Sequence, residues 1–252
     1  METQEINSAN LHNLTSLWES MGADACSVAG LEQFRVSRSW PHRCWASCAM
    51  NEAVIDKAQS GLQRLAGRHI VPVWDSGTSA EWETVLISRG FGVGFKQTAM
   101  YLALGDDAHA GAEESPATRV ELELVSSASE IQRWTQVSSA AFGYDIDPGA
   151  IATLANDSNA FLYTASVGAE PAATALLFQT NGVVGVHQVG VLRAFRGQGI
   201  ARELMRALLP AVHELGALYI TLQASAMGEG LYRSLGFVEQ FGIRNYRLKG
   251  NQ

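Results

Sequence analysis

One stretch, residues 183–201, constrains this chain more than any other, because it is typical of a strand, a glycine-bearing basic turn and the start of a helix. Valines recur from Val183 to Val191, a β-branched composition that suits a pleated, partly buried strand. Apolar residues then recur at three- and four-residue spacing from Ile200 to Leu215, which predicts a helix with one buried face.

The turn between this strand and helix predicts a cradle for a diphosphate. Gly197 and Gly199 let the backbone adopt positive φ and approach a ligand closely. Free N–H groups at a helix start bind anions, and Arg193 and Arg196 can add charge-assisted hydrogen bonds. The turn lacks the lysine of a P-loop, and Arg202 stands where a dinucleotide fingerprint has its third glycine.

Two motifs in order resemble the GNAT superfamily of N-acetyltransferases. The pattern R-x-x-G-x-A, from Arg196 to Ala201, follows a V-x-V strand end and resembles the acyl-CoA pyrophosphate loop of that family. The sequence LYRSLGF at residues 231–237 resembles the end of the short GNAT helix that follows the next strand. The resemblance implies an α/β fold with a mixed α+β sheet, the GNAT fold.

The first part of the chain, residues 1–104, resembles a second, degenerate GNAT lobe. Its Gly90-Phe91 pair can be superposed on the Gly-Phe pair of the second motif, but Leu86 then stands at the tyrosine position. No R-x-x-G-x-A loop precedes the helix predicted from Ala53, so we expect no acyl-CoA site here. The alternative is a generic α/β lobe whose Gly-Phe ending is coincidental.

A linker and the catalytic domain follow. Residues 105–118 are small and acidic without Lys or Arg, which is typical of a linker, and residues 119–252 carry both motifs. In the first lobe we expect helices at 11–21, 53–65 and 80–88, short strands within 26–50, a strand at 69–74, and a hairpin of 91–95 with 98–104. In the second we expect a strand at 119–125, a helix at 130–142 capped by Ser129, a short helix opened by Asp147-Pro148, and a hairpin of 160–167 with 172–179.

The resemblance implies acetyl-CoA as co-substrate, direct attack of an amine on the thioester and no metal. Backbone N–H groups at the strand end would polarise the thioester carbonyl, those of the loop would hold the pyrophosphate with the Arg196 side chain as support, and Ser225 would contact the pantetheine arm. The candidate cofactor-binding residues are Val189, Gly190, Val191, Arg196, Gly197, Gln198, Gly199, Ile200, Ala201 and Ser225.

Two residues are candidates for proton transfer. Tyr232 lies where the family places a tyrosine that protonates the leaving thiolate, although a tyrosine on a short helix can also be part of the core. Gly185 holds the position of the glutamate base of many GNAT enzymes, and His187, two residues on, points to the same strand face. A water relay, self-deprotonation of the substrate and a purely structural histidine are the alternatives to His187 as base.

Composition excludes several classes of protein. The net charge is −7 without a basic face, which argues against nucleic acid as a partner. No apolar run has the length of a membrane span, the N-terminus is polar, and three cysteines give no disulfide framework, so we expect a cytoplasmic protein. His42, Cys44 and Cys48 lack the spacing of a zinc site.

The predicted activity is acetyl transfer to a primary amine of a small molecule or to a peptide amino terminus, with the acceptor near the cleft between the lobes. The alternative from another class is a non-catalytic acyl-CoA-binding module. The sequence leaves the acceptor, the acyl length and the oligomeric state open, with a homodimer among the options.

Overall fold

The computed structural model describes residues 3–48, 51–65, 69–74, 79–105 and 119–249. The first lobe contains α1 (Thr3–Ser20), β1 (Ala23–Ala25), β2 (Phe34–Ser37), β3 (Cys44–Ala46), α2 (Glu52–Arg64), β4 (Ile70–Trp74), α3 (Ser79–Ser88) and β5 (Phe91–Ala103). The second contains β6 (Val120–Leu124), α4 (Ala128–Phe142), α5 (Pro148–Leu154), β7 (Ala160–Val167), β8 (Glu170–Thr180), β9 (Val183–Val191), a 3-10 turn η2 (Arg193–Phe195), α6 (Ile200–Ala207), α7 (Leu209–Glu214), β10 (Tyr219–Ser225), α8 (Glu229–Ser234) and β11 (Val238–Leu248).

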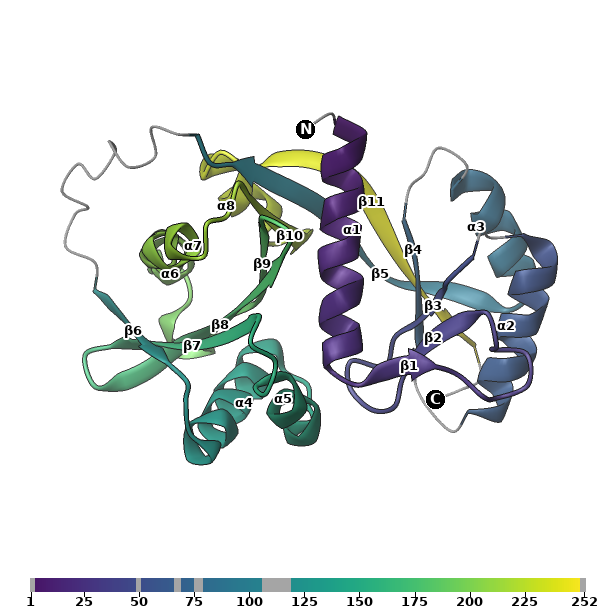
Figure 1. Cartoon of the computed structure of the whole chain (residues 1–252), viewed down its shortest axis with the longest axis horizontal. Coiled ribbons are helices and arrows are strands. Elements are labelled where there is room, and N and C mark those ends of the chain that lie inside the picture. Colours follow the sequence, from purple (N-terminus) through teal and green to yellow (C-terminus); the bar gives the residue numbers. More distant parts are fainter. Residues whose placement is uncertain (1–2, 49–50, 66–68, 75–78, 106–118, 250–252) are drawn as a thin grey trace.

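The strands form two sheets, and the larger one runs through both lobes. A three-stranded sheet has the order β1-β2-β3, and an eight-stranded sheet has the order β4-β11-β5-β10-β9-β8-β7-β6. Figure 1 shows the two lobes on either side of α1, with β5 and β11 crossing from one to the other behind it. The second lobe has the predicted mixed sheet, since β9 and β10 are parallel and the other neighbours are antiparallel.

The hairpin predicted within residues 91–104 is wrong, because this segment is one continuous strand. β5 pairs with β11 along its length, from Phe91 opposite Leu248 to Tyr101 opposite Val238. Its second half, Gln97–Ala103, also pairs with all of β10. The predicted break at Lys96-Gln97 contains no glycine, proline or asparagine to form a turn, so pairing on both sides keeps the strand extended.

The exchange of strands between the lobes follows from this pairing. β5, from the first lobe, lies between β10 and β11 of the second, and the last half of β11 pairs with β4 of the first. The predicted boundary at residues 105–118 therefore separates the two lobes along the sequence but does not divide the sheet. Residues 106–118 of the predicted linker lie outside the described part of the chain.

Helices cover both faces of the sheet in the second lobe. On one face, α6, α7 and α8 pack apolar side chains such as Leu204 and Val212 onto the sheet. On the other face, α4 and α5 pack around Trp134, which is fully buried and donates its Nε1–H to Tyr163 O at 3.0 Å. The end of α1 joins this second face through Leu17.

Local signals set the helix ends in this lobe. α4 begins after Ser127 rather than the predicted Ser129, because Ser127 accepts the Glu130 N–H while the Glu130 carboxylate accepts the Ser127 N–H. Asp147 caps α5 as predicted. The apolar stretch that starts at Ile200 forms two helices rather than one, since Pro210 has no N–H to continue the first.

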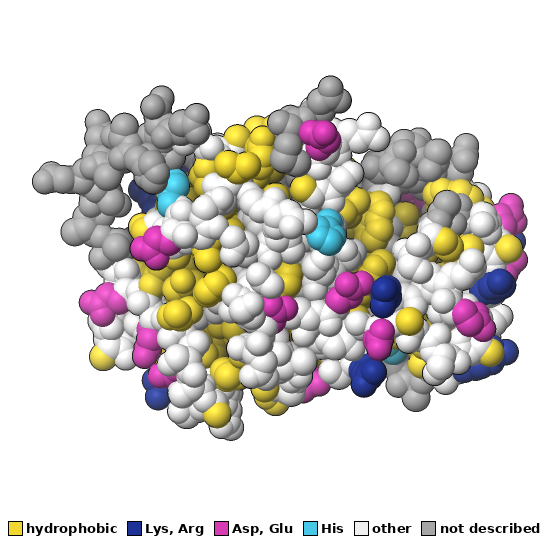
Figure 2. Space-filling view, viewed as in Figure 1, with side chains coloured by type: hydrophobic (Ala, Val, Ile, Leu, Met, Phe, Trp, Pro, Cys, Tyr) yellow, Lys and Arg dark blue, Asp and Glu magenta, His cyan; other side chains and the backbone are white. Residues whose placement is uncertain are grey.

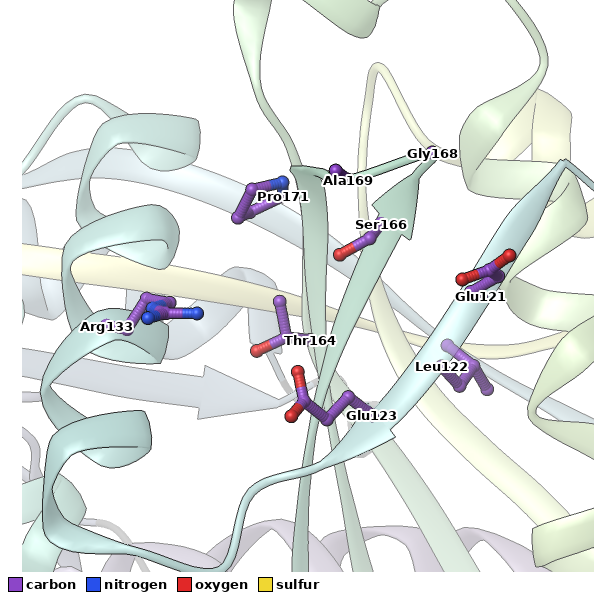
Figure 3. Close-up of a pocket in the computed structure, with 9 residues that line it drawn as sticks. All are labelled: Glu121, Leu122, Glu123, Arg133, Thr164, Ser166, Gly168, Ala169 and Pro171. Atoms are coloured by element: carbon purple, nitrogen blue, oxygen red, sulfur yellow. The ribbon is translucent and has the colours of Figure 1, made fainter.

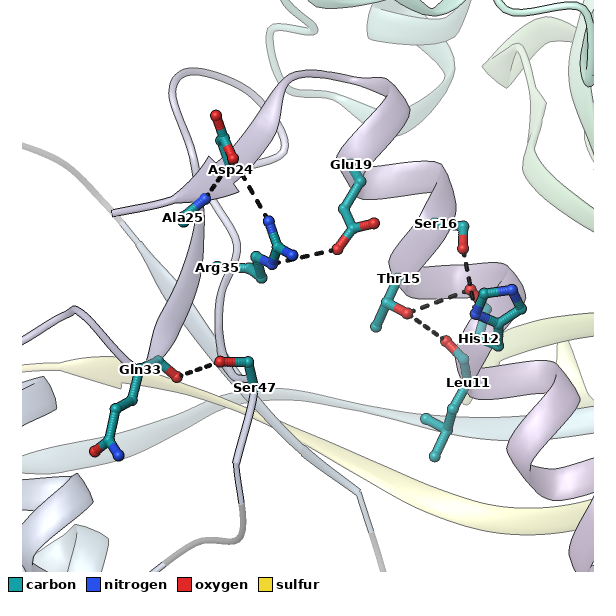
Figure 4. Close-up of polar contacts among 10 residues, drawn as sticks. All are labelled: Leu11, His12, Thr15, Ser16, Glu19, Asp24, Ala25, Gln33, Arg35 and Ser47. Atoms are coloured by element: carbon teal, nitrogen blue, oxygen red, sulfur yellow. Dashed lines mark hydrogen bonds and ion pairs between the residues drawn. The ribbon is translucent and has the colours of Figure 1, made fainter. Parts of the chain in front are cut away.

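The first helix ties the two lobes together. It begins at Thr3, earlier than the predicted Leu11, and ends near the small sheet, where Arg35 lies 3.6 Å from Glu19 and 3.5 Å from Asp24 (Figure 4). Figure 2 shows acidic and basic side chains side by side on this surface, and such exposed pairs contribute little to stability. The main connection is an apolar cluster, which we call the interlobe core: Leu14, Trp18, Ala23, Trp45, Ala99 and Ile243.

Among the described helices, none combines the length and the apolar character needed to cross a membrane.

Candidate active site

The two parallel strands at the centre of the second lobe separate halfway along their length. β9 and β10 pair from Val183 opposite Tyr219 as far as Gly185 opposite Thr221. Beyond this point β9 continues to Val191 and pairs only with β8 among the described strands. The separation exposes one edge of β9 to a ligand, as the GNAT resemblance implies.

A bulge shapes the separated part of β9. Gln188 has a φ of 49°, and the pairing with β8 shifts between His187 opposite Leu176 and Gly190 opposite Thr174. Gly190 packs closely against α4, because an added Cβ would lie 2.7 Å from Phe142 Cε2 and 3.0 Å from Ala141 Cβ, so that these side chains would have to move. The predicted carbonyl-binding residues therefore lie next to a local distortion of the strand.

The open edge of β9 offers a backbone N–H group. The Leu192 N–H donates to Ala172 O of β8 at 2.9 Å, and successive N–H groups along a strand alternate in direction. The Val191 N–H and C=O therefore face the side from which β10 has separated. The Arg196 Nε–H donates to Val191 O at 3.0 Å, which is consistent with the Val191 C=O facing away from β8.

The predicted pyrophosphate loop lies directly after this strand, on the surface. Gly197 and Gly199 have φ values of 73° and 83°, a region that favours glycine. The first main-chain hydrogen bonds of α6 are those of Arg202 and Glu203 to Gly199 O. The N–H groups of residues 197–201 donate to no other described residue, which leaves five amide hydrogens at the start of a helix for an anion.

Two arginines brace this loop. Besides its bond to the strand, Arg196 donates through Nη2 to Ala141 O at 2.5 Å, so its guanidinium joins the loop to α4. Arg119 donates through Nη2 to Gln198 O at 2.6 Å and to Glu203 Oε1 at 2.7 Å. Sequence reasoning missed Arg119, because it lies far from the loop along the chain and belongs to no motif.

Tyr232 lies on α8 beneath the same end of the sheet. The residue is 9% exposed, and its ring packs edge-on against Phe237 at 5.7 Å between ring centroids. Burial raises the pKa of Tyr232 to about 12, so the phenol keeps its proton at neutral pH. Its hydroxyl forms no hydrogen bond with another described residue. Ser225 is exposed at the end of β10, where its carbonyl accepts the Gly228 N–H at 2.8 Å.

His187 is buried on the opposite face of the sheet, against α1. Its Nε2 lies 3.1 Å from Asn13 Oδ1, and Asn13 Nδ2 donates to Phe178 O at 2.8 Å and to Thr180 Oγ1 at 2.9 Å. Since Asn13 uses its amide hydrogens elsewhere, its oxygen is the acceptor and His187 Nε2 carries the hydrogen. Burial lowers the pKa of His187 to about 4, so the imidazole is neutral at neutral pH and weakly basic.

Helix α1 also explains why a glycine holds the position of the family glutamate. A Cβ on Gly185 would lie 1.9 Å from Asn13 Oδ1 and 2.3 Å from His187 Nε2, so a longer side chain has no space. Asn10, one turn earlier, accepts from Gln223 Nε2 of β10 at 2.7 Å. The asparagines of α1 thus close the strand separation at the level of His187. Sequence reasoning missed them, although their three-residue spacing on an apolar helix face was a signal.

The buried histidine predicts how stability depends on pH. An unfolded histidine has a pKa of about 6.5, so between about pH 6.5 and pH 4 the unfolded chain binds a proton that His187 does not, and wild-type stability falls by up to about 3 kcal/mol. We expect His187→Gln to lose less stability over this range than the wild type. Urea unfolding at pH 7 and pH 4.5 measures the difference, with His12→Gln, an exposed position on α1, as the matched control. Equal losses in the wild type and His187→Gln would contradict the assignment.

A surface pocket of about 280 Å³ lies elsewhere, at the β6 edge of the sheet (Figure 3). Glu121 and Glu123 of β6, Thr164 and Ser166 of β7, and Arg133 of α4 line it with the turn between β7 and β8. None of its lining residues is a predicted site residue. Within the described ranges, no His, Cys, Asp and Glu side chains are grouped as metal ligands.

Comparisons with known proteins agree with this geometry. A family model described as "Acetyltransferase (GNAT) domain" matches residues 118–247. A GCN5-related N-acetyltransferase from Kribbella flavida is similar in structure, with a TM-score of 0.68 and 18% identity over 99% of this chain and 96% of that one. A tandem GNAT protein from the clavulanic acid biosynthesis pathway has a TM-score of 0.56 and 14% identity, covering 85% of this chain and 77% of that one.

A curated relative matches a shorter stretch. The N-alpha-acetyltransferase MAK3 of Arabidopsis thaliana is 36% identical over 63 residues, which are 24% of this chain and 33% of the relative. This chain therefore spans about a third of the length of that relative. Because the family model covers half of the chain and the similar structures share its fold over both lobes, the chain belongs to the GNAT acetyltransferase family, in a tandem arrangement.

Proposed function

We propose that the chain is an N-acetyltransferase that transfers an acetyl group from acetyl-CoA to a primary amine of a small molecule or of a peptide amino terminus. The observation that carries the proposal is the position of the five free amides of residues 197–201 directly after the separated end of β9. An acyl-CoA requires this arrangement, because its diphosphate would lie on these amides and its acyl chain along the open edge of the strand. The family to which the chain belongs uses acyl-CoA as co-substrate.

We assign two steps of the proposed reaction to groups of this chain. The amine nitrogen attacks the thioester carbonyl carbon, and the Val191 N–H on the open edge donates to the oxygen as it becomes negative. The new C–N bond forms, the C–S bond breaks, and the electron pair leaves on sulfur. Tyr232, which is protonated at neutral pH before the step, donates its proton to the thiolate, and the phenolate then takes a proton from solvent.

The amine loses its own proton to water in this proposal, and His187 positions the strand rather than acting as base. Its low pKa makes it a poor acceptor for a proton from an ammonium group, and its Nε2–H is held by Asn13. Helix α1 packs against the face of β9 on which His187 lies. The alternatives of a water relay or a substrate that enters deprotonated fit this arrangement better.

The catalytic unit that we propose is the domain at residues 119–252 completed by β5. The lobe at residues 1–104 supplies that strand and α1. Asn51 caps its helix α2, and no loop with the R-x-x-G-x-A pattern precedes this helix in the sequence. We therefore assign one acyl-CoA site to the chain.

Release of free CoA tests the function. We expect the purified protein to release CoA thiol from acetyl-CoA only when an amine from a mixed panel is present, with mass spectrometry finding the matching acetylated amine. Bound acetyl-CoA without transfer to any amine would instead support the non-catalytic binding module. Thiol release that is independent of amine would indicate hydrolysis and contradict the proposal.

A further inference from the structure

The surface pocket at the β6 edge of the large sheet brings together charged side chains that do not pair with one another (Figure 3). Glu121 and Glu123 of β6 and Arg133 of α4 all line it. Within the described part of the chain, none of these three side chains forms an ion pair or a hydrogen bond. Charged groups of both signs therefore face one cavity of about 280 Å³ without neutralising each other.

Thr164 of β7 lies at the base of this pocket. Only 5% of the residue is exposed, yet its hydroxyl forms no hydrogen bond with another described residue. The oxygen is not one of the unpaired polar atoms that are shielded from solvent, so it stays accessible from the pocket that it lines. Figure 3 shows it pointing into the space between Arg133 and Glu123. A buried hydroxyl without a partner costs free energy, and a ligand in the pocket would supply the partner.

The strand register places the polar groups of β6 and β7 on one face of the sheet. Glu123 lies opposite Thr164, and Glu121 lies opposite Ser166. Because side chains alternate along a strand, the Cα atoms of the two glutamates are about 7 Å apart on the same face. Arg133 faces them from α4. The pocket thus presents two carboxylates at a fixed spacing, a guanidinium opposite them and two hydroxyls between.

This pocket is separate from the proposed acyl-CoA site. Across the strands, Thr164 lies opposite Thr174 and Thr174 opposite Gly190. Two strand spacings put Thr164 about 10 Å from Gly190. Thr174, between them, is fully buried and donates its hydroxyl hydrogen to Gln188 O at 3.2 Å. Packed side chains therefore divide the pocket from the open end of β9, and a ligand can occupy it without displacing an acyl-CoA.

We propose that the pocket is a second binding site, for a small amino acid with a cationic side chain, such as lysine or ornithine. The carboxylate of the ligand binds the Arg133 guanidinium, whose parallel N–H groups match it. The α-ammonium donates to Glu123 and to the Thr164 hydroxyl, and the side-chain ammonium donates to Glu121. Two carboxylates and one guanidinium give the pocket a charge of −1, which a ligand of charge +1 neutralises.

Simpler ligands leave part of the pocket unsatisfied. A diamine has no carboxylate for Arg133, and an amino acid with an apolar side chain leaves Glu121 unpaired. A divalent cation would be repelled by Arg133, and within the described ranges no His, Cys, Asp and Glu side chains are grouped as metal ligands. The volume of about 280 Å³ lies just below the range of about 300–1,000 Å³ in which larger organic ligands bind.

Calorimetry with lysine and three matched analogues tests the proposal. Lysinamide and 1,5-diaminopentane lack the carboxylate, and norleucine lacks the side-chain ammonium. We expect one lysine per chain with a Kd of about 1 mM or tighter, and binding at least about tenfold weaker for each analogue, because a charged partner is left unpaired. The Kd for lysine should be the same with saturating CoA present, and CoA replaces acetyl-CoA here so that no acetyl group can be transferred.

Variants assign the preferences to the pocket. Arg133→Gln should bring the affinities for lysine and lysinamide close together, and Glu121→Gln should do the same for lysine and norleucine. Thr164→Val, which keeps the shape of the side chain, should weaken the binding of lysine. The matched control is Glu170→Gln, an exposed position at the start of β8 that does not line the pocket, and it should bind as the wild type does. Thermal melting without ligand shows whether each variant keeps its fold.

Three results would overturn this inference. These are no binding of lysine or ornithine by the wild-type protein, unchanged preferences in Arg133→Gln and Glu121→Gln, and displacement of lysine by CoA, which would place the ligand at the acyl-CoA site. The inference does not depend on the proposed function, since lysine binding is measured without acetyl transfer. A protein that binds lysine in this way but does not transfer acetyl groups would contradict the proposed function alone.

Discussion

Residues 119–252 produced alone are expected to aggregate or remain unfolded, although they contain both GNAT motifs. Without β5 the ladders of β10 and β11 lose their shared neighbour, and the fully buried Met100 leaves the main core. Two adjacent strand edges then lie open, which favours association between chains. Circular dichroism and size-exclusion chromatography of the isolated segment measure the outcome.

The control divides the chain at the same place and supplies both segments. Co-expression of residues 1–118 with 119–252 should give a soluble complex that binds acetyl-CoA, because the cut falls in a segment of linker composition and β5 is again supplied. If the isolated segment 119–252 were monomeric and unfolded cooperatively, the shared strand would be dispensable. This result would contradict the claim that strand exchange between the lobes is required for folding.

Replacing Tyr232 by phenylalanine should lower kcat at least about tenfold, since general acids typically contribute that much or more. The ring and its packing against Phe237 remain, so the fold and the affinity for acetyl-CoA should not change. Steady-state kinetics with calorimetry of acetyl-CoA binding separate the two effects. Because burial raises the pKa of Tyr232 to about 12, loss of its proton should not limit the rate at any pH below about 10.

Tyr219→Phe is the matched control for this variant. Tyr219 begins β10, packs near Tyr101 at 6.3 Å between ring centroids and takes no part in the proposed reaction. It should retain wild-type kcat. An unchanged kcat in Tyr232→Phe would remove Tyr232 from the mechanism and return it to the core.

The features that could be predicted from the sequence are local ones. The strand, loop and helix at residues 183–201 are determined by neighbours along the chain, and the positive φ of Gly197 and Gly199 follows from their residue type. The LYRSLGF motif places Tyr232 in the same way. The start of α4 was also predictable, since Ser127 and Glu130 have the spacing of a capping box.

The features that could not be predicted depend on contacts between distant segments. Nothing within Phe91–Ala103 indicates that its partners are β10 and β11, because strand pairing is decided by which edges meet in three dimensions. The hydrogen bonds from His187 to Asn13 and from Arg119 to Gln198 also join residues far apart in sequence. For this reason a histidine that resembles a general base in the sequence lies buried beneath a helix.

The sharing of strands changes how the tandem arrangement is understood. The segments 1–104 and 119–252 remain two units along the chain, but the interlobe core and the crossing of β5 and β11 join them into one folded body. A first lobe without an acyl-CoA loop can be retained because it completes the sheet.

Calorimetry of CoA binding to the intact chain tests the central claim, that the loop at residues 196–201 holds the diphosphate of the coenzyme. Gly199→Ala and Gly168→Ala form a matched pair, since both replace a glycine at positive φ, of 83° and 61°, and only the first is in the loop. We predict one CoA per wild-type chain, the same for Gly168→Ala, and binding at least about tenfold weaker for Gly199→Ala, a loss of about 1.4 kcal/mol. No uptake of CoA by the wild-type protein, or equal affinities in the two variants, would contradict the account.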